Sequence, residues 1–166
     1  MVILDSTVLL LLLDPNARPP IDQNTGRPLD RCLERVACLL ESLERTKTIA
    51  LIPTPVLCEV LVFAQNRNEV LKRIHTYPVF DVGVFDRGAA IATAELIKAQ
   101  LSQKDISYGK ARMKFDAQIL GIAKVRNATT IYTDDQRLAR QAIANNLTAI
   151  STHQLPLPPQ GELPLD

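Results

Sequence analysis

The feature that most constrains the fold is an alternation of short apolar runs with longer segments of helical spacing. Five runs have the length and composition of buried strands, at residues 2–4, 48–52, 79–85, 129–133 and 147–150. Helical segments lie between or after them, at residues 29–46, 54–66, 68–75, 86–102, 114–125 and 135–145. Such alternation produces a parallel sheet with helices on both faces. The sequence therefore predicts a three-layer α/β/α sandwich around a central, mostly parallel sheet of about five strands.

The remaining segments are polar or rich in proline and indicate loops. Residues 14–30 form a long loop of Pro, Asn, Asp and Gly, and residues 103–112 form a second polar loop. The chain of 166 residues suits one domain with a substantial core. We expect this domain to span residues 1–152, followed by a Pro-rich tail at 153–166 that lies on the surface or frays.

Composition excludes several classes of protein. Hydrophobic residues make up 46% and charged residues 22% of the chain. These are ordinary globular values, and they exclude disordered and fibrous proteins. The net charge of +1 neither indicates nor excludes a nucleic-acid partner. No apolar run approaches the roughly 18 residues of a membrane span, and Asp5 interrupts the N-terminal apolar stretch, so we expect no membrane association and a cytoplasmic location. Three cysteines indicate no disulfide framework, and Cys38 and Cys58 are interpreted as small buried hydrophobes.

Carboxylates stand in several apolar surroundings where a charge is costly. Asp5 ends the first apolar run, Glu59 lies within PVLCEVLVFA, and Asp116 lies within KFDAQILGIA. A buried carboxylate must be paired, protonated or bound to a metal, and no buried Arg or Lys is evident beside these three. Asp134 and Asp135 follow the fourth strand directly.

The order of elements brings these acids together. The carboxyl ends of parallel strands meet at one edge of a sheet, where ligands usually bind. Four or five carboxylates converging there would repel one another without cations. Hard oxygen ligands without His or Cys favour Mg²⁺ or Mn²⁺ over zinc. Divalent ions of this kind support in-line hydrolysis of a phosphodiester, which is the reaction class that the pattern indicates.

The same motifs resemble the PIN-domain family over roughly residues 1–150. A PIN domain opens with a strand ending in Asp and Ser/Thr, here Asp5-Ser6-Thr7, and carries a Glu on the helix after the second strand, here Glu59 in TPVLCEVL. It then has an Asp early in a later helix, here Asp116 in FDAQILGIA, and a strand ending in Thr and acids, here Thr133-Asp134-Asp135.

The resemblance implies a Rossmann-like fold and RNA cleavage that depends on Mg²⁺ or Mn²⁺. Metal ligands would be Asp5, Glu59, Asp116 and one of the two adjacent acids, with Asp135 favoured by the family's Thr-x-Asp pattern and Asp134 by its nearness to the strand. Thr7 and Thr133 would support the site. Many bacterial members are similar to VapC toxins, which implies an RNA substrate and an antitoxin protein as partner. The long loop at 14–30 and the tail depart from compact toxins.

Other interpretations of these residues remain open. Asp5, Asp116 or one of the adjacent acids can serve as helix caps or early-helix charges. The basic cluster of Lys110, Arg112 and Lys114 can hold RNA phosphates or form a solvated loop, and the same alternatives apply to Arg137 and Arg140. Tyr108 can stack on a base.

Two other functions compete with the nuclease. One is a non-catalytic PIN-fold module that binds RNA or protein, because a fold alone gives no function. The other is a phosphatase with Asp5 as nucleophile, although its Asp-x-Asp pattern would need an acid where Thr7 stands. Apolar residues at 56–63 also predict a surface for an antitoxin or for a homodimer.

Overall fold

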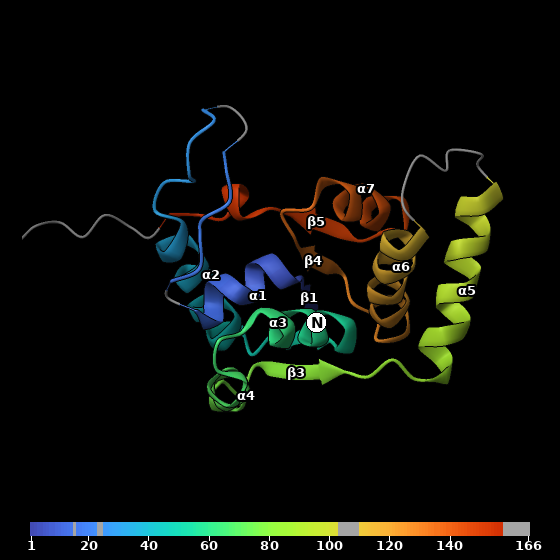
Figure 1. Cartoon of the computed structure of the whole chain (residues 1–166), viewed down its shortest axis with the longest axis horizontal. Helices are drawn as coiled ribbons and strands as arrows, with labels where there is room; N and C mark the ends of the chain where they lie inside the picture. The colour runs from blue at the N-terminus through green and yellow to red at the C-terminus, as the bar shows by residue number, and fades with distance from the viewer. Residues whose placement is uncertain (15, 23–24, 103–109, 158–166) are drawn as a thin grey trace, which may run out of the picture.

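The computed structural model describes residues 1–14, 16–22, 25–102 and 110–157 (Figure 1). Within them, one five-stranded sheet runs through the middle of the molecule with seven α-helices around it. The strands are β1 (Val2–Leu4), β2 (Ala50–Pro53), β3 (Phe80–Gly83), β4 (Thr130–Tyr132) and β5 (Thr148–Ile150). They are parallel throughout, in the order β3-β2-β1-β4-β5. The predicted three-layer α/β/α sandwich is confirmed.

The direction of strand addition reverses at β1, which pairs with β2 on one side and with β4 on the other. Val2 lies opposite Ala50 in one register and opposite Thr130 in the other. In open α/β sheets, the crevice at such a reversal is where ligands bind, outside the carboxyl ends of the strands. The residues after β1 and β4 therefore occupy the place where a site is expected.

The helices also match the predicted segments, with one difference at a functional position. They are α1 (Ser6–Leu13), α2 (Cys32–Thr46), α3 (Thr54–Phe63), α4 (Arg67–Thr76), α5 (Arg87–Ser102), α6 (Lys110–Val125) and α7 (Gln136–Ala144), followed by a short 3-10 helix, η1 (Thr152–Gln154). The predicted loop at 103–112 is wrong in its last part, because α6 already begins at Lys110. Lys, Ala, Arg and Met are strong helix formers, so this start agrees with local propensity.

The helical spacing of residues 29–46 predicts one apolar face with Leu33, Val36, Ala37, Leu40 and Leu43, and the buried face of α2 differs from it in part. Cys32, Val36, Leu39 and Leu43 are buried, whereas Leu33 is 42% exposed. The buried positions follow the usual spacing of three or four residues. The predicted face included Leu33 and left out Cys32 and Leu39, which are buried in the structure.

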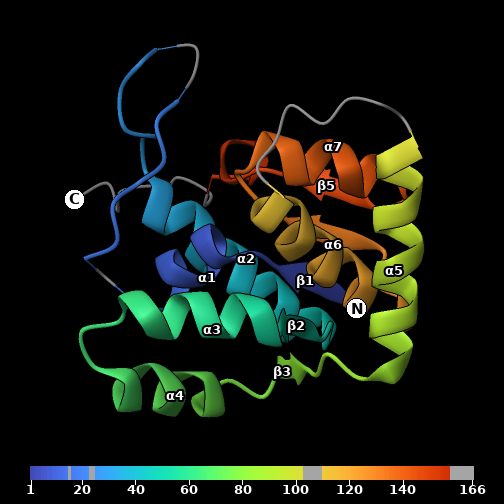
Figure 2. The same ribbon diagram turned by 45° about the vertical axis from the view of Figure 1, so that its right-hand side comes forward.

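Helices α5 and α6 lie side by side in both views, at one end of the sheet (Figures 1 and 2). Gly121 permits their close approach, since a Cβ built there would lie 2.2 Å from Thr93 Oγ1 and 2.8 Å from the Ala89 carbonyl oxygen. The Thr93 hydroxyl donates to the Ala117 carbonyl across the same contact at 3.2 Å. This packing fixes the part of α6 that carries Asp116.

The chain remains packed beyond the predicted domain boundary at residue 152. Leu155 is buried, and the Arg35 guanidinium donates to its carbonyl oxygen at 2.5 Å. The division at 152 stays a prediction, but residues 153–155 pack with the domain. None of the helices in the described part of the chain is long and apolar enough to cross a membrane.

Candidate metal centre

Asp5 lies at the end of the central strand, where a charged side chain is least expected. It is the N-cap of α1, and the residue is only 5% exposed. Asp5 Oδ1 accepts a hydrogen bond from the Ser6 amide at 2.7 Å, and Oδ2 accepts one from the Thr133 hydroxyl at 2.6 Å. Both oxygens are thereby oriented, which is how a buried carboxylate is made tolerable.

Thr133 joins the ends of β1 and β4. Its side chain is buried, and its Oγ1 accepts from the Asp135 amide at 3.1 Å while donating to Asp5. Asp135 in turn caps α7, with Oδ1 accepting from the amides of Arg137 and Leu138 at 2.8 and 3.1 Å. A short hydrogen-bonded chain thus links the N-termini of α1 and α7 and fixes Asp5 and Asp135 relative to each other.

Asp134, although adjacent to Asp135, lies elsewhere. Its two carboxylate oxygens accept from the Thr152 amide at 2.8 Å and the Thr152 hydroxyl at 2.6 Å. It borders a separate hollow with Asp22 and His153. The geometry therefore separates the two candidates that the sequence left open, and only Asp135 faces the same pocket as Asp5.

Glu59 comes from the opposite side of this pocket, on α3. It is half-buried, and its neighbours Cys58, Val62 and Phe63 line the pocket with it. Val62 and Phe63 are 62% and 71% exposed. The prediction that Cys58 and Cys38 are buried is wrong, because Cys58 is exposed and Cys38 is half-buried, whereas Cys32 is the buried thiol.

Asp116 has a cationic partner that the sequence did not reveal. Its side chain is 6% exposed, and its Oδ2 lies 2.7 Å from Nη2 of Arg137, whose side chain is 12% exposed. The same Nη2 lies 3.9 Å from Asp135 Oδ2. The expectation that no buried Arg or Lys stands near the acids is therefore wrong. The two residues are distant in the chain, and only the placement of α7 beside α6 brings them together.

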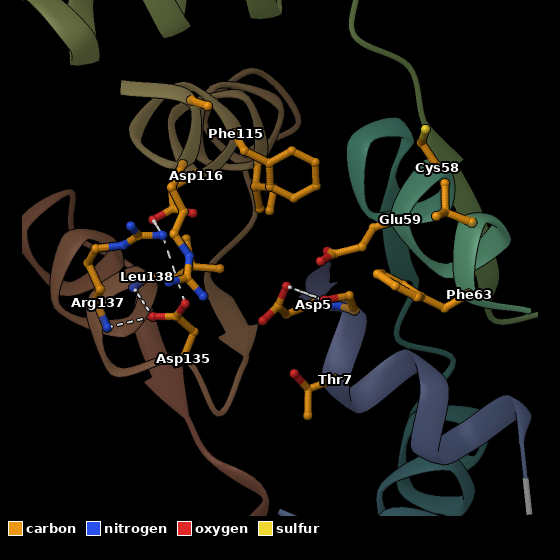
Figure 3. Close-up of a pocket in the computed structure, with 15 residues that line it drawn as sticks. Asp5, Thr7, Cys58, Glu59, Phe63, Phe115, Asp116, Asp135, Arg137 and Leu138 are labelled. Carbon is orange, nitrogen blue, oxygen red and sulfur yellow. Dashed lines mark hydrogen bonds and ion pairs between the residues drawn. The ribbon is translucent and has the colours of Figure 1, made fainter. Parts of the chain in front are cut away.

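These side chains surround one pocket of about 610 Å³. In Figure 3, Asp5 lies in the middle, Glu59 reaches in from α3, and Asp116, Asp135 and Arg137 lie on the opposite side. Thr7 also lines the pocket, next to Asp5 in the close-up. The sequence-predicted acids except Asp134 are thus brought to one hollow, at the point where the sheet order reverses.

The electrostatics of the pocket oppose the ionised carboxylates. Burial raises the pKa of Asp5, the charges of Glu59 and Asp135 raise it further, and the Thr133 and Ser6 hydrogen bonds counteract this. Burial raises the pKa of Asp116 to about 6, and the charges of Asp135 and Asp5 add to the effect while Arg137 lowers it. A nearby cation would relieve both shifts, because it favours the ionised form.

A divalent cation fits the chemistry of this donor set. Within the described ranges, no three His, Cys, Asp or Glu side chains form a ready-made metal cluster. Mg²⁺ does not require one, since it is usually held by one or two carboxylates and keeps several waters. The buried carboxylates of Asp5 and Asp116 would provide such ligands. Glu59 and Asp135 line the same pocket and would bind the waters or complete the shell.

The predicted RNA-binding residues are only partly assembled here. Arg112 is exposed and lines the pocket on the first turn of α6, whereas Lys114 is exposed and lies outside its lining. The side chain of Lys110 and the whole of Tyr108 lie outside the described residues. Arg140 is exposed on α7, where its Nε donates to the Gln136 carbonyl at 3.3 Å.

Comparison with known proteins finds similarity in structure alone. No family model matches the sequence, and no curated protein matches it. Among solved structures, a chain of VapBC2 from Rickettsia felis, solved with a DNA fragment from its promoter, has a TM-score of 0.60 at 17% identity, covering 91% of this chain and 98% of that one. A chain of DNA-bound VapBC from Salmonella typhimurium has a TM-score of 0.57 at 15% identity, covering 91% and 97%.

A third similar structure is VapC20 of Mycobacterium tuberculosis, a toxin that cleaves the sarcin–ricin loop. Its TM-score is 0.51 at 12% identity, and the alignment covers 89% of this chain and 97% of VapC20. The parallel five-stranded sheet with its flanking helices is thus the PIN fold. More particularly, the chain has a VapC-like PIN fold, as the sequence motifs predicted.

Proposed function

We propose that this protein is a metal-dependent endoribonuclease that hydrolyses RNA phosphodiester bonds and acts as the toxin of a type II toxin–antitoxin pair. The observation that carries the proposal is the convergence of Asp5, Glu59, Asp116 and Asp135 on one pocket at the carboxyl edge of the sheet. The VapC-like fold supports it, because VapC20 with the same fold is a toxin that cleaves the sarcin–ricin loop.

In this proposal the carboxylates hold Mg²⁺ or Mn²⁺. Asp5 and Asp116 are the inner ligands, since they are the most deeply buried acids of the pocket. When bound, the ion supplies positive charge at the scissile phosphate and a more acidic water. The Thr133 hydroxyl keeps Asp5 Oδ2 oriented at 2.6 Å, and Thr7 supports the site from the first turn of α1. Arg112 on the pocket wall binds a neighbouring phosphate.

The experiment compares cleavage of a mixed pool of structured RNA with Mg²⁺, with Mn²⁺ and with chelator. We expect cleavage with either metal by the wild type, and none by an Asp5→Asn/Asp116→Asn double variant. A single-stranded DNA arm tests whether the substrate is RNA. Cleavage that persists in the double variant would contradict the site, and no cleavage under any condition would contradict the nuclease.

A second pair of variants compares the adjacent acids. Asp135→Asn retains an N-cap for α7, because Asn caps helices about as well as Asp. We expect it to lose most cleavage, whereas Asp134→Asn, which can still accept the Thr152 amide, retains it. The opposite ranking would mean that the pocket containing Asp134 carries the chemistry.

The proposed partners are an antitoxin and a second copy of this chain, in the cytoplasm. Two of the similar structures contain chains named VapBC bound to DNA, which supports an antitoxin partner. The exposed Val62 and Phe63, next to a hollow lined by Leu57 and Leu61 of α3, provide an apolar surface for one of these partners. Light scattering of the purified chain would detect the homodimer.

Two alternatives give different results in the same assays. A non-catalytic PIN-fold module would bind RNA or protein without cleaving and would show no metal-induced rise in melting temperature. A phosphatase with Asp5 as nucleophile would form an acid-stable phosphoenzyme with a small phosphate ester. Neither result is expected from the nuclease, which cleaves without a covalent intermediate on the protein.

A further inference from the structure

Arg137 forms the most buried ion pair of the described residues, and it does so inside an acidic pocket. Its Nη2 lies 2.7 Å from Asp116 Oδ2, and the two side chains are 12% and 6% exposed. In each of the other ion pairs between Arg or Lys and Asp or Glu, apart from the one to Asp135, at least one partner is 44% exposed or more. Exposed pairs contribute little to stability, whereas a buried charge strongly requires its partner.

The guanidinium of Arg137 lies among the carboxylates of the pocket. Burial raises the pKa values of Asp5 and Asp116, and the nearby charge of Asp135 raises both of them further. Arg137 lies between Asp116 and Asp135, 3.9 Å from the latter, and so places one fixed positive charge among them (Figure 3). Arginine keeps its charge at every physiological pH. The protein therefore carries its own counter-ion for this cluster.

A divalent cation requires the same negative charge. Asp116 Oδ2 is in direct contact with the guanidinium, and both side chains are largely buried. A metal ion at Asp116 would therefore repel that guanidinium at short range with little screening by water. Binding of the metal therefore includes the cost of displacing Arg137 from Asp116 or of holding two cations together.

We propose that Arg137 is the resident counter-ion of the metal-free centre and that it competes with the divalent cation for Asp116. This inference rests on the proposed function, because it assumes that Asp116 is a metal ligand. Arg137 stabilises the protein without metal, and the same contact weakens metal affinity. An alternative role would be to hold Asp116 in position for the metal. In that role, Arg137 would strengthen the metal affinity instead of weakening it.

The test is calorimetric titration of chelator-treated protein with Mn²⁺ for the wild type and for Arg137→Gln. We expect Arg137→Gln to bind Mn²⁺ about tenfold more tightly, to melt at a lower temperature in chelator, and to show a larger rise in melting temperature with Mn²⁺. The matched control is Arg140→Gln, which removes the same charge from an exposed position of the same helix. The Mn²⁺ affinity of this control is expected to remain within about twofold of that of the wild type, because exposed charges are screened.

Arg137→Lys provides a second variant that keeps the charge but lacks the planar fork. We expect its Mn²⁺ affinity to lie between those of the wild type and Arg137→Gln. A Mn²⁺ affinity that is equal to or weaker than that of the wild type in both variants would overturn the proposal and would indicate the positioning role. A wild type that binds neither Mn²⁺ nor Mg²⁺ would instead contradict the metal centre itself, so the two failures are distinguishable.

Discussion

The two sides of the pocket differ in how they are held. On the strand side, Asp5, Thr133 and Asp135 are joined by hydrogen bonds of 2.6 and 3.1 Å, and their positions follow from neighbouring parallel strands. On the α3 side, Glu59 stands on a helix face next to Val62 and Phe63, which are 62% and 71% exposed. The first side is a fixed polar network, and the second is an open, largely apolar surface.

This difference separates two tasks within one site. Side chains that bind a metal ion must be held in position within narrow limits. Hydrogen bonds from rigid helices and strands hold them there. A contiguous apolar surface exposed to water usually marks an interaction site. We infer that the strand side determines the chemistry of the pocket. The α3 side instead determines which partner binds beside the pocket. Changes on the two sides should therefore have different consequences.

The largest effect is expected on the strand side, at Asp5. Asp5→Asn keeps the shape and the Ser6 hydrogen bond but removes the negative charge from the centre of the pocket. Loss of a residue that only orients a metal ligand already lowers metal affinity or activity about 10- to 100-fold. For loss of the ligand itself, we expect the metal-dependent cleavage rate to fall by at least about 100-fold. A loss of less than tenfold in a quantitative cleavage assay would show that Asp5 is not a ligand.

Thr133 should have the next largest effect. Thr133→Val removes the donor to Asp5 Oδ2 and the acceptor for the Asp135 amide, within a buried site. Leaving these groups unsatisfied costs about 1–3 kcal/mol each, so denaturant unfolding should show reduced stability, with cleavage reduced about 10- to 100-fold. Thr133→Ser retains the hydroxyl and is the control. Equal losses in both variants would contradict the orienting role.

The pH dependence of stability tests the burial of Asp116. Its pKa in the folded protein, about 6, lies above the ordinary value of 3.8 for an aspartate. The folded state therefore binds the proton more tightly, and the free energy of unfolding falls as the pH rises from about 4 to about 6. Thermal unfolding in chelator should show this slope, and Asp116→Asn should reduce it. An unchanged slope in Asp116→Asn would assign the effect to other groups, such as Asp5.

The smallest effect on stability is expected on the α3 side. Phe63→Ser changes an exposed side chain, so the free energy of unfolding should change by no more than about 0.5 kcal/mol. Self-association or antitoxin binding should weaken, as light scattering would detect. A large loss of stability would show that Phe63 packs inside the protein, and the contrast between the two sides would then fail.

Much of the site was predictable because it depends on the ends of strands. Asp5 and Asp135 follow β1 and β4 directly, and parallel strands bring their carboxyl ends to one edge whatever the details of packing. Glu59 and Asp116 were recognisable as acids among apolar neighbours. Their arrival at the same pocket agrees with the prediction, while their role as metal ligands stays a prediction.

The remaining features depended on distances that a linear pattern does not contain. Asp134 and Asp135 are neighbouring residues of the same type. The chain after β5 brings Thr152 of η1 to Asp134, whereas Asp135 lines the same pocket as Asp5. The early start of α6 at Lys110 was missed because polar residues suit both loops and helices.

The sequence alone determined the order of strands and helices, the apolar core and the acids at the edge of the sheet, because each depends on local periodicity and on residue type. Only the tertiary structure decided that Arg137 of α7 neutralises Asp116 of α6 and that Phe63 stays exposed beside Glu59. Such relations follow from the packing of helices on a common sheet. The energy of a buried charge therefore depends on neighbours that are far away in the chain.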